Sequence, residues 1–229
     1  MTRRLLQLYA GLALYGVSMA FFVQGRLGVM PWDVLHQGLI HRVPISLGAM
    51  TIAAAVVVLL GWIPLRQRPG FGTVSNVIVI GLVVDQALRV LPAPEWIGGR
   101  IGFVLAGVGL NAIATAAYIG ARLGPGPRDG LMTGIVARTG WSVRSVRTAI
   151  EVAVVATGWL LGGNFGAATV LYALAIGPLV QPLLPLLAVR ARVDPTEGCS
   201  IATDATTGVA APRRSRRGGV AASAGEDQR

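Results

Sequence analysis

The chain has 229 residues, of which 53% are hydrophobic and 13% are charged, and its formal net charge is +10. Soluble domains carry about 25% charged residues, so this composition predicts a membrane protein with several spans. All 20 basic residues are arginine, and they lie at the N-terminus, between apolar runs and in the tail. Such a distribution sets membrane topology and does not indicate nucleic-acid binding. The single cysteine, Cys199, excludes a disulfide framework and a cysteine-based metal cluster.

Six apolar segments are long enough to span a membrane, because a spanning helix needs about 20 predominantly apolar residues. We interpret the first segment as an uncleaved helix rather than a signal peptide, since its apolar run is long for one. The sequence therefore predicts an all-α polytopic membrane protein with six transmembrane helices. These segments are residues 5–24, 45–65, 73–92, 98–121, 145–163 and 166–189.

The arginines predict that both chain termini are cytoplasmic, because cytoplasmic loops carry an excess of basic residues. With the N-terminus inside, the opposite side holds only Arg26, Arg42, Arg89 and Arg100. From residue 190 onward the chain is rich in Ala, Gly, Ser, Thr and charge and has no apolar period. This composition predicts a disordered cytoplasmic tail over residues 191–229.

One pattern, R-L-G-x-x-P-x-D-x-L-x-x-G, occurs at residues 26–38 and again at residues 122–134, each time after an apolar segment. Outside it, Ser46 and Ser142 also fall in register, which indicates a duplicated unit of span, motif, span and span. Because each unit has an odd number of spans, the second copy starts on the other side of the membrane. The two copies therefore lie in opposite orientations. The sequence thus predicts two inverted three-helix repeats, residues 1–96 and 97–190, each with a short re-entrant or interfacial motif helix.

Each residue type in the motif suits the start of a short helix. Glycine permits a sharp turn, proline fits the first helical position, and aspartate in the first turn accepts from free backbone N–H groups. In one interpretation the two motif helices are half-helices whose N-termini line a polar site between the repeats. In the other, the aspartates only cap helices that lie in the membrane interface. The candidate binding residues are Arg26, Gly28, Pro31, Asp33, Gly38, Arg122, Gly124, Pro127, Asp129 and Gly134.

Three further polar residues lie inside predicted spans, where ionisable groups are costly and by default functional candidates. Asp85 and Glu151 each have an arginine four residues away, Arg89 and Arg147, so each also fits an ion pair on its own helix. We favour the ion pair for Glu151 and leave both interpretations open for Asp85, which is a candidate proton or cation coupling group. Asn111 is expected to bond to a neighbouring helix.

The sequence shows no nucleophile–base pair, phosphate loop or metal cluster, so we expect neither an enzyme, a cofactor nor a metal site. His36 and His41 lack a third ligand at metal spacing. The expected partners are membrane lipid and a small-molecule solute, without nucleic acid, and nothing in the sequence indicates a homo-oligomer.

The G-x-x-P-W-D-x-L-x-x-G block at residues 28–38, with its counterpart at 124–134, resembles the YczE/YitT-type family of bacterial integral membrane proteins. The resemblance covers roughly residues 5–190, and Val29 and Met30 depart from the small residues usual before the proline. It implies a multi-pass protein of the bacterial cytoplasmic membrane and adds no chemistry.

Two functions follow as hypotheses. The first is a secondary transporter or permease for a small solute, with its site between the two motifs. The alternative is an accessory or scaffolding membrane protein that moves no solute. A polar cavity that reaches the middle of the membrane between the motifs favours transport, whereas a dry, packed centre favours scaffolding.

Overall fold

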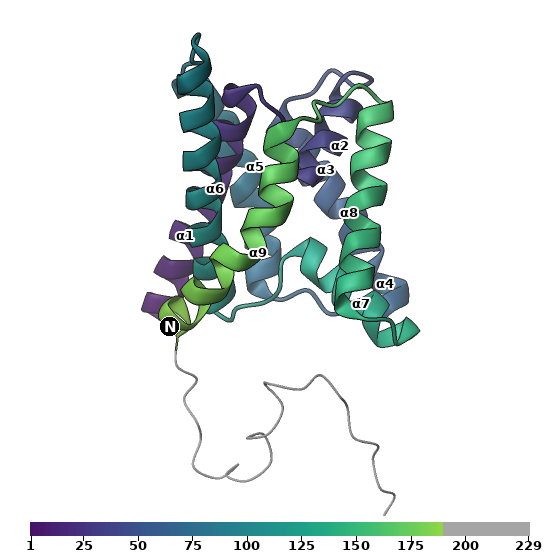
Figure 1. Ribbon diagram of the computed structural model, residues 1–229. Helices are drawn as coiled ribbons and strands as arrows, with labels where there is room; N and C mark the ends of the chain where they lie inside the picture. The colour runs from purple at the N-terminus through teal and green to yellow at the C-terminus, as the bar shows by residue number, and fades with distance from the viewer. Residues whose placement is uncertain (190–229) are drawn as a thin grey trace, which may run out of the picture. The chain divides into compact units, whose positions relative to one another are not determined.

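The computed structural model describes residues 1–189, which form one compact unit (Figure 1). This part of the chain contains nine helices and no strand, so the predicted all-α class is confirmed. The predicted tail, residues 191–229, lies outside the described residues. The helices are α1 (Thr2–Gly25), α2 (Pro31–Ile40), α3 (Leu47–Leu60), α4 (Trp62–Leu65), α5 (Phe71–Val90), α6 (Ile97–Gly120), α7 (Pro127–Thr139), α8 (Val143–Leu160) and α9 (Ala167–Leu187).

Five helical segments are long and apolar enough to cross a membrane: α1, α3 continued by α4, α5, α6 and α9. They coincide with five of the six predicted spans. Helix α8 occupies the place of the remaining one and has 18 residues, but Arg144, Arg147 and Glu151 make it more polar than the other five. The sixth span therefore stays a prediction.

The outward surface of these helices is apolar. Leu174 on α9 is 72% exposed and Leu160 on α8 is 79% exposed, and many other large aliphatic side chains point outward with them. A soluble monomer rarely exposes contiguous apolar surface on this scale, because it is costly in water. The exposed faces fit a lipid environment.

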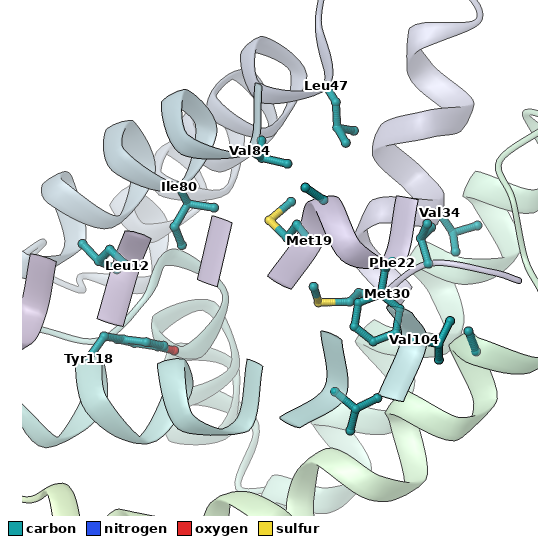
Figure 2. Close-up of a cluster of buried hydrophobic side chains, with 14 of the residues drawn as sticks. Leu12, Met19, Phe22, Met30, Val34, Leu47, Ile80, Val84, Val104 and Tyr118 are labelled. Carbon is teal, nitrogen blue, oxygen red and sulfur yellow. The ribbon is translucent and has the colours of Figure 1, made fainter. Parts of the chain in front are cut away.

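Helix α1 is the centre of the packing, with α5 and α6 against it, while α6 also packs on α9. Side chains from α1 and from the segment that follows it, among them Met19, Phe22 and Met30, gather in one buried cluster (Figure 2). Gln7 near the start of α1 bonds to the carbonyl oxygen of Ala117 near the end of α6, at 3.0 Å. Helices α1 and α6 therefore run antiparallel.

Corresponding helices in the two halves begin in the same way. Ser46 and Ser142 are the N-caps of α3 and α8, and each hydroxyl accepts a backbone N–H at 3.1 Å. Such caps satisfy donors that have no partner inside the helix. Thr73 and Thr169 in turn accept the N–H of the glycine that precedes α5 and α9. The sequence repeat is thus matched by repeated local structure.

Helix α2 packs on α8 and α3, and α7 also packs on α8 and α3. The two motif helices lie toward opposite ends of the bundle, α2 near the top and α7 near the bottom of Figure 1. Pro31 and Pro127 open these helices, as predicted. Gly38 and Gly134 lie close to Gly158 and Leu65 of neighbouring elements, so a small residue at each position permits close packing.

Candidate functional site

Each motif begins with a backbone turn in the left-handed region. The φ angles of Arg26 and Arg122 are 53° and 54°, and those of Gly28 and Gly124 are 113° and 130°. Residues with a Cβ rarely adopt the latter conformation, whereas glycine adopts it at little steric cost. The sharp turns predicted from the two glycines are therefore present at both sites.

Both turns are held by the first turn of a helix from the other half of the chain. The carbonyl oxygen of Leu27 accepts the N–H of Ala168 in α9 at 3.0 Å, and that of Leu123 accepts the N–H of Gly72 in α5 at 2.8 Å. N–H groups at a helix start lack intrahelical partners, so these bonds satisfy them. The contacts fix where α2 and α7 begin.

The two motif aspartates bond to side chains. Asp33 Oδ1 lies 3.0 Å from Nδ1 of His36 on the next turn of α2. Asp129 Oδ2 accepts the Tyr118 hydroxyl of α6 at 2.8 Å. Among the described residues, no backbone N–H bonds to either carboxylate. Neither aspartate caps its helix through a backbone hydrogen bond: Asp33 bonds to a side chain of its own helix, and Asp129 bonds to a side chain of α6.

A cavity of about 510 Å³ is lined by the first turns of both motif helices. Pro31 and Trp32 enter its wall from α2, and Pro127 and Arg128 enter from α7. The guanidinium of Arg128 lies over the indole ring of Trp32, with its Cζ 4.8 Å from the ring centroid. The second residues of the two motif helices thus meet at the cavity.

Polar side chains from four other helices complete the wall. Thr51 comes from α3, Asn76 from α5, Tyr118 from α6, and Tyr172 and Gln181 from α9. Small and aliphatic side chains fill the spaces between them. A largely apolar wall with a few convergent polar groups is typical of a small-molecule site.

Helix α8 contributes an ion pair. Arg147 Nε donates to Glu151 Oε1 at 2.9 Å, which confirms the pair predicted from their spacing. Both side chains line the cavity. The charged part of α8 therefore faces the polar interior.

Asn111 is fully buried and joins three helices. Its amide nitrogen donates to Ser18 Oγ on α1 at 2.9 Å, and its amide oxygen accepts the Tyr172 hydroxyl of α9 at 2.9 Å. The predicted bond to a neighbouring helix is confirmed. Because Tyr172 lies in the cavity wall, Asn111 supports the wall from behind.

The family of unknown function DUF6198 matches residues 2–184 of this chain. The chain belongs to this family. An uncharacterized protein of Haemophilus influenzae is 39% identical to it over 177 residues, which cover 77% of this chain and 81% of the relative. The uncharacterized membrane protein YczE of Bacillus subtilis is 32% identical over 180 residues, which cover 77% and 83% respectively. No solved structure matches the chain.

The resemblance inferred from the motif is therefore confirmed, and the DUF6198 match includes both motif copies. In this DUF6198 protein the predicted site residues other than Asp85 fall into four groups. Pro31, Pro127, Asp129 and Glu151 line the cavity. Asp33 and Asn111 are buried and touch residues of its wall, while the four motif glycines shape the turns and the close packing. Arg26 and Arg122 are exposed and lie outside the cavity wall.

Asp85 lies apart from the cavity. Its Oδ2 accepts the Ser46 hydroxyl at 2.5 Å and its Oδ1 accepts the N–H of Gly48 at 2.7 Å. Within the described residues it forms no ion pair with Arg89, so that alternative is wrong. Its carboxylate stabilises the N-terminus of α3, where free N–H groups favour a negative charge.

Several wall residues escaped the sequence analysis. His36 was weighed only as a metal ligand, Trp32 served only in the family resemblance, and Arg128 stood at a variable motif position. One signal was present, since Trp32 and Arg128 occupy the same position in the two motif copies. The contact between Trp32 and Arg128 depends on how the two halves pack, which their positions in the motif do not predict.

Proposed function

We propose that this DUF6198 protein is a secondary transporter or permease for a small solute in the bacterial cytoplasmic membrane. The observation that carries the proposal is the cavity bounded by the first turns of α2 and α7. A cavity with a few convergent polar groups at this place is what a solute site between two motif half-helices requires. The proposal assigns the wall residues to binding rather than to catalysis.

The proposal includes α8 as the sixth span. Its charges count against a helix that faces lipid on all sides, because ionisable groups in a membrane are costly unless paired or turned to a polar interior. Arg147 and Glu151 satisfy both conditions, since they pair with each other and line the cavity. Both termini of the six-span unit are then on one side, which the arginine distribution favours as cytoplasmic.

The proposal also includes inverted repeats. The turn at Leu27 follows α1 and contacts the start of α9, and the turn at Leu123 follows α6 and contacts the start of α5. Since α1 and α6 are antiparallel, the matched turns belong to opposite ends of the bundle. Matched contacts at opposite ends support two units of opposite orientation.

The two halves are packed differently, which supports alternating access. Gly48 of α3 approaches Gly81 of α5 so closely that an added Cβ would collide with the Gly81 carbonyl oxygen. Gly177 of α9 corresponds to Gly81 in the repeat, and it has open space around it and lines the cavity. If the two halves exchange these arrangements, with α8 and α9 approaching each other while α3 and α5 separate, the cavity closes at one end of the bundle and opens at the other.

Cysteine accessibility tests the proposal without knowledge of the solute. A Cys199→Ser background removes the single native cysteine. Ala55→Cys places a thiol in the cavity wall, and Leu174→Cys, on the apolar outer face, is the matched control. Right-side-out and inside-out vesicles are treated with a membrane-impermeant maleimide.

A transporter predicts that Ala55→Cys is labelled from both sides and Leu174→Cys from neither. A scaffolding protein with a static centre predicts labelling of Ala55→Cys from one side at most. This second result, with protein that is folded and monodisperse, would overturn the transport proposal.

A further inference from the structure

The first turns of α2 contain a buried acid–base pair. Asp33 and His36 are 0% and 1% exposed, and Asp33 Oδ1 lies 3.0 Å from His36 Nδ1. The other carboxylate oxygen, Oδ2, is the single buried side-chain N or O atom in the described residues without a hydrogen-bond partner. Burying an unpartnered polar atom is costly, and more so when it is charged. This unpartnered atom belongs to Asp33, a residue of the first motif.

The surroundings of His36 indicate which ring nitrogen holds the proton. The Thr51 hydroxyl donates to the Leu47 carbonyl oxygen at 2.9 Å, so its oxygen is left to accept from Nδ1 at 3.3 Å. Asp33 also accepts from Nδ1. Nδ1 therefore carries the hydrogen, and Nε2 is the nitrogen that gains or loses a proton. His36 lines the cavity, and no hydrogen bond to Nε2 occurs within residues 1–189.

The charges around the pair also favour the binding of a proton. The helices that meet at the cavity present Arg128 and Asp129 from α7 and Arg147 and Glu151 from α8. The uncharged tyrosines of the wall are Tyr15, Tyr118 and Tyr172, from α1, α6 and α9. The two arginines balance Asp129 and Glu151, and Asp33 then leaves one negative charge in excess. A proton on His36 removes this excess. The interior is thus electrically balanced only when the pair holds a proton.

We infer that Asp33 and His36 form a proton-binding site that is loaded from the cavity. A proton from water in the cavity adds to the Nε2 lone pair, which gives an imidazolium beside the Asp33 carboxylate, with no change in oxidation state. The pair, and not Asp85, is the proton-coupling group of the transporter. This coupling role rests on the proposed function, whereas proton binding itself does not.

The chain has only two histidines, so one substitution isolates His36. His41→Gln removes the exposed histidine at the end of α2. The variant is labelled with ¹⁵N-histidine, reconstituted into lipid vesicles and measured by solid-state NMR from about pH 5 to about pH 8, the range in which histidine charge changes. We expect His36 to change from a doubly protonated ring to a neutral ring protonated at Nδ1. A single ring form throughout this range would overturn the inference.

Asp33→Asn in the same background tests the pair. Without the carboxylate, burial disfavours the charged ring, so we expect His36 to stay neutral over the whole range. An unchanged transition would show that His36 titrates alone and would overturn the pair. Asp33→Ser is smaller and also lacks the carboxylate, and it replaces Asp33→Asn if that variant does not fold.

The two proposals fail separately. If His36 binds a proton but Ala55→Cys is labelled from one side only, the proton site stands and the transport proposal is rejected. If Ala55→Cys is labelled from both sides but His36 shows no transition, the transport proposal stands and the proton site is rejected.

Discussion

Arg128 lies over the indole ring of Trp32, 4.8 Å from its centroid, and so joins the first turns of the two motif helices across the cavity. The two residues hold the same position in the two copies of the motif. A guanidinium over an indole contributes about 0.5–1 kcal/mol at exposed sites and about 2 kcal/mol or more when desolvated. Arg128 forms no ion pair within residues 1–189, so this contact is its main interaction with the rest of the wall.

A double-mutant cycle measures this contact. We expect Trp32→Leu and Arg128→Gln to show a coupling free energy of about 0.5–2 kcal/mol in thermal unfolding in detergent, because either substitution alone removes the cation–π interaction. Trp32→Leu with Arg144→Gln, an exposed arginine at the start of α8, is the matched control and should be additive. Additivity in both cycles would show that the contact is not energetically significant.

The glycines of the two turns should be intolerant of a side chain. Gly28→Ala and Gly124→Ala force a Cβ into positive φ and against the start of a neighbouring helix, so we expect each to destabilise the protein by about 1–3 kcal/mol. Gly102→Ala is the control, since it lies in α6 with open space around it and should gain helix stability of about 0.5–1 kcal/mol. Equal melting temperatures for Gly28→Ala and Gly102→Ala would contradict the strained turn.

Gly177 should matter for movement and not for the stability of the observed conformation. We expect Gly177→Leu to fold without loss of stability, because the space around this position is open and leucine is a better helix former than glycine. If α8 and α9 approach each other in the proposed exchange, the larger side chain at position 177 blocks that movement. Ala55→Cys should then be labelled from one side only. Labelling from both sides in this variant would count against the proposed exchange of packings.

Asp85 should act on the stability of α3 alone. Asp85→Asn weakens the bonds to Ser46 and the Gly48 N–H, and we expect a loss of about 1 kcal/mol, as for other groups that satisfy a helix N-terminus. Labelling of Ala55→Cys and the titration of His36 should both be unchanged. A shift of the His36 transition in Asp85→Asn would instead place Asp85 in the proton-coupling network.

Local patterns in the sequence were sufficient to predict most of the helices. Long apolar runs place α1, α3, α5, α6 and α9, because hydrophobicity and helix length depend on residues near in sequence. Pro31 and Gly28, with their counterparts, likewise mark the start of each motif helix, since backbone conformation at Gly and Pro is largely intrinsic. Helix α8 was predicted in place, although its charges set it apart from the apolar spans.

The roles of the polar residues depended on tertiary contacts. For Asp33 a helix cap was one of two open interpretations, and this residue bonds to His36. For Asp85 an ion pair with Arg89 was one of two, and this residue instead holds the start of α3. Asp129 and Asp85 bond to donors on other helices or at their starts, which packing brings near, whereas Asp33 bonds to a residue three positions along its own helix. By itself, the sequence determined the helices, the family and the duplicated motif. The cavity and the contact between Trp32 and Arg128 were decided only by how the two halves pack, because they are made of residues that no local pattern brings together.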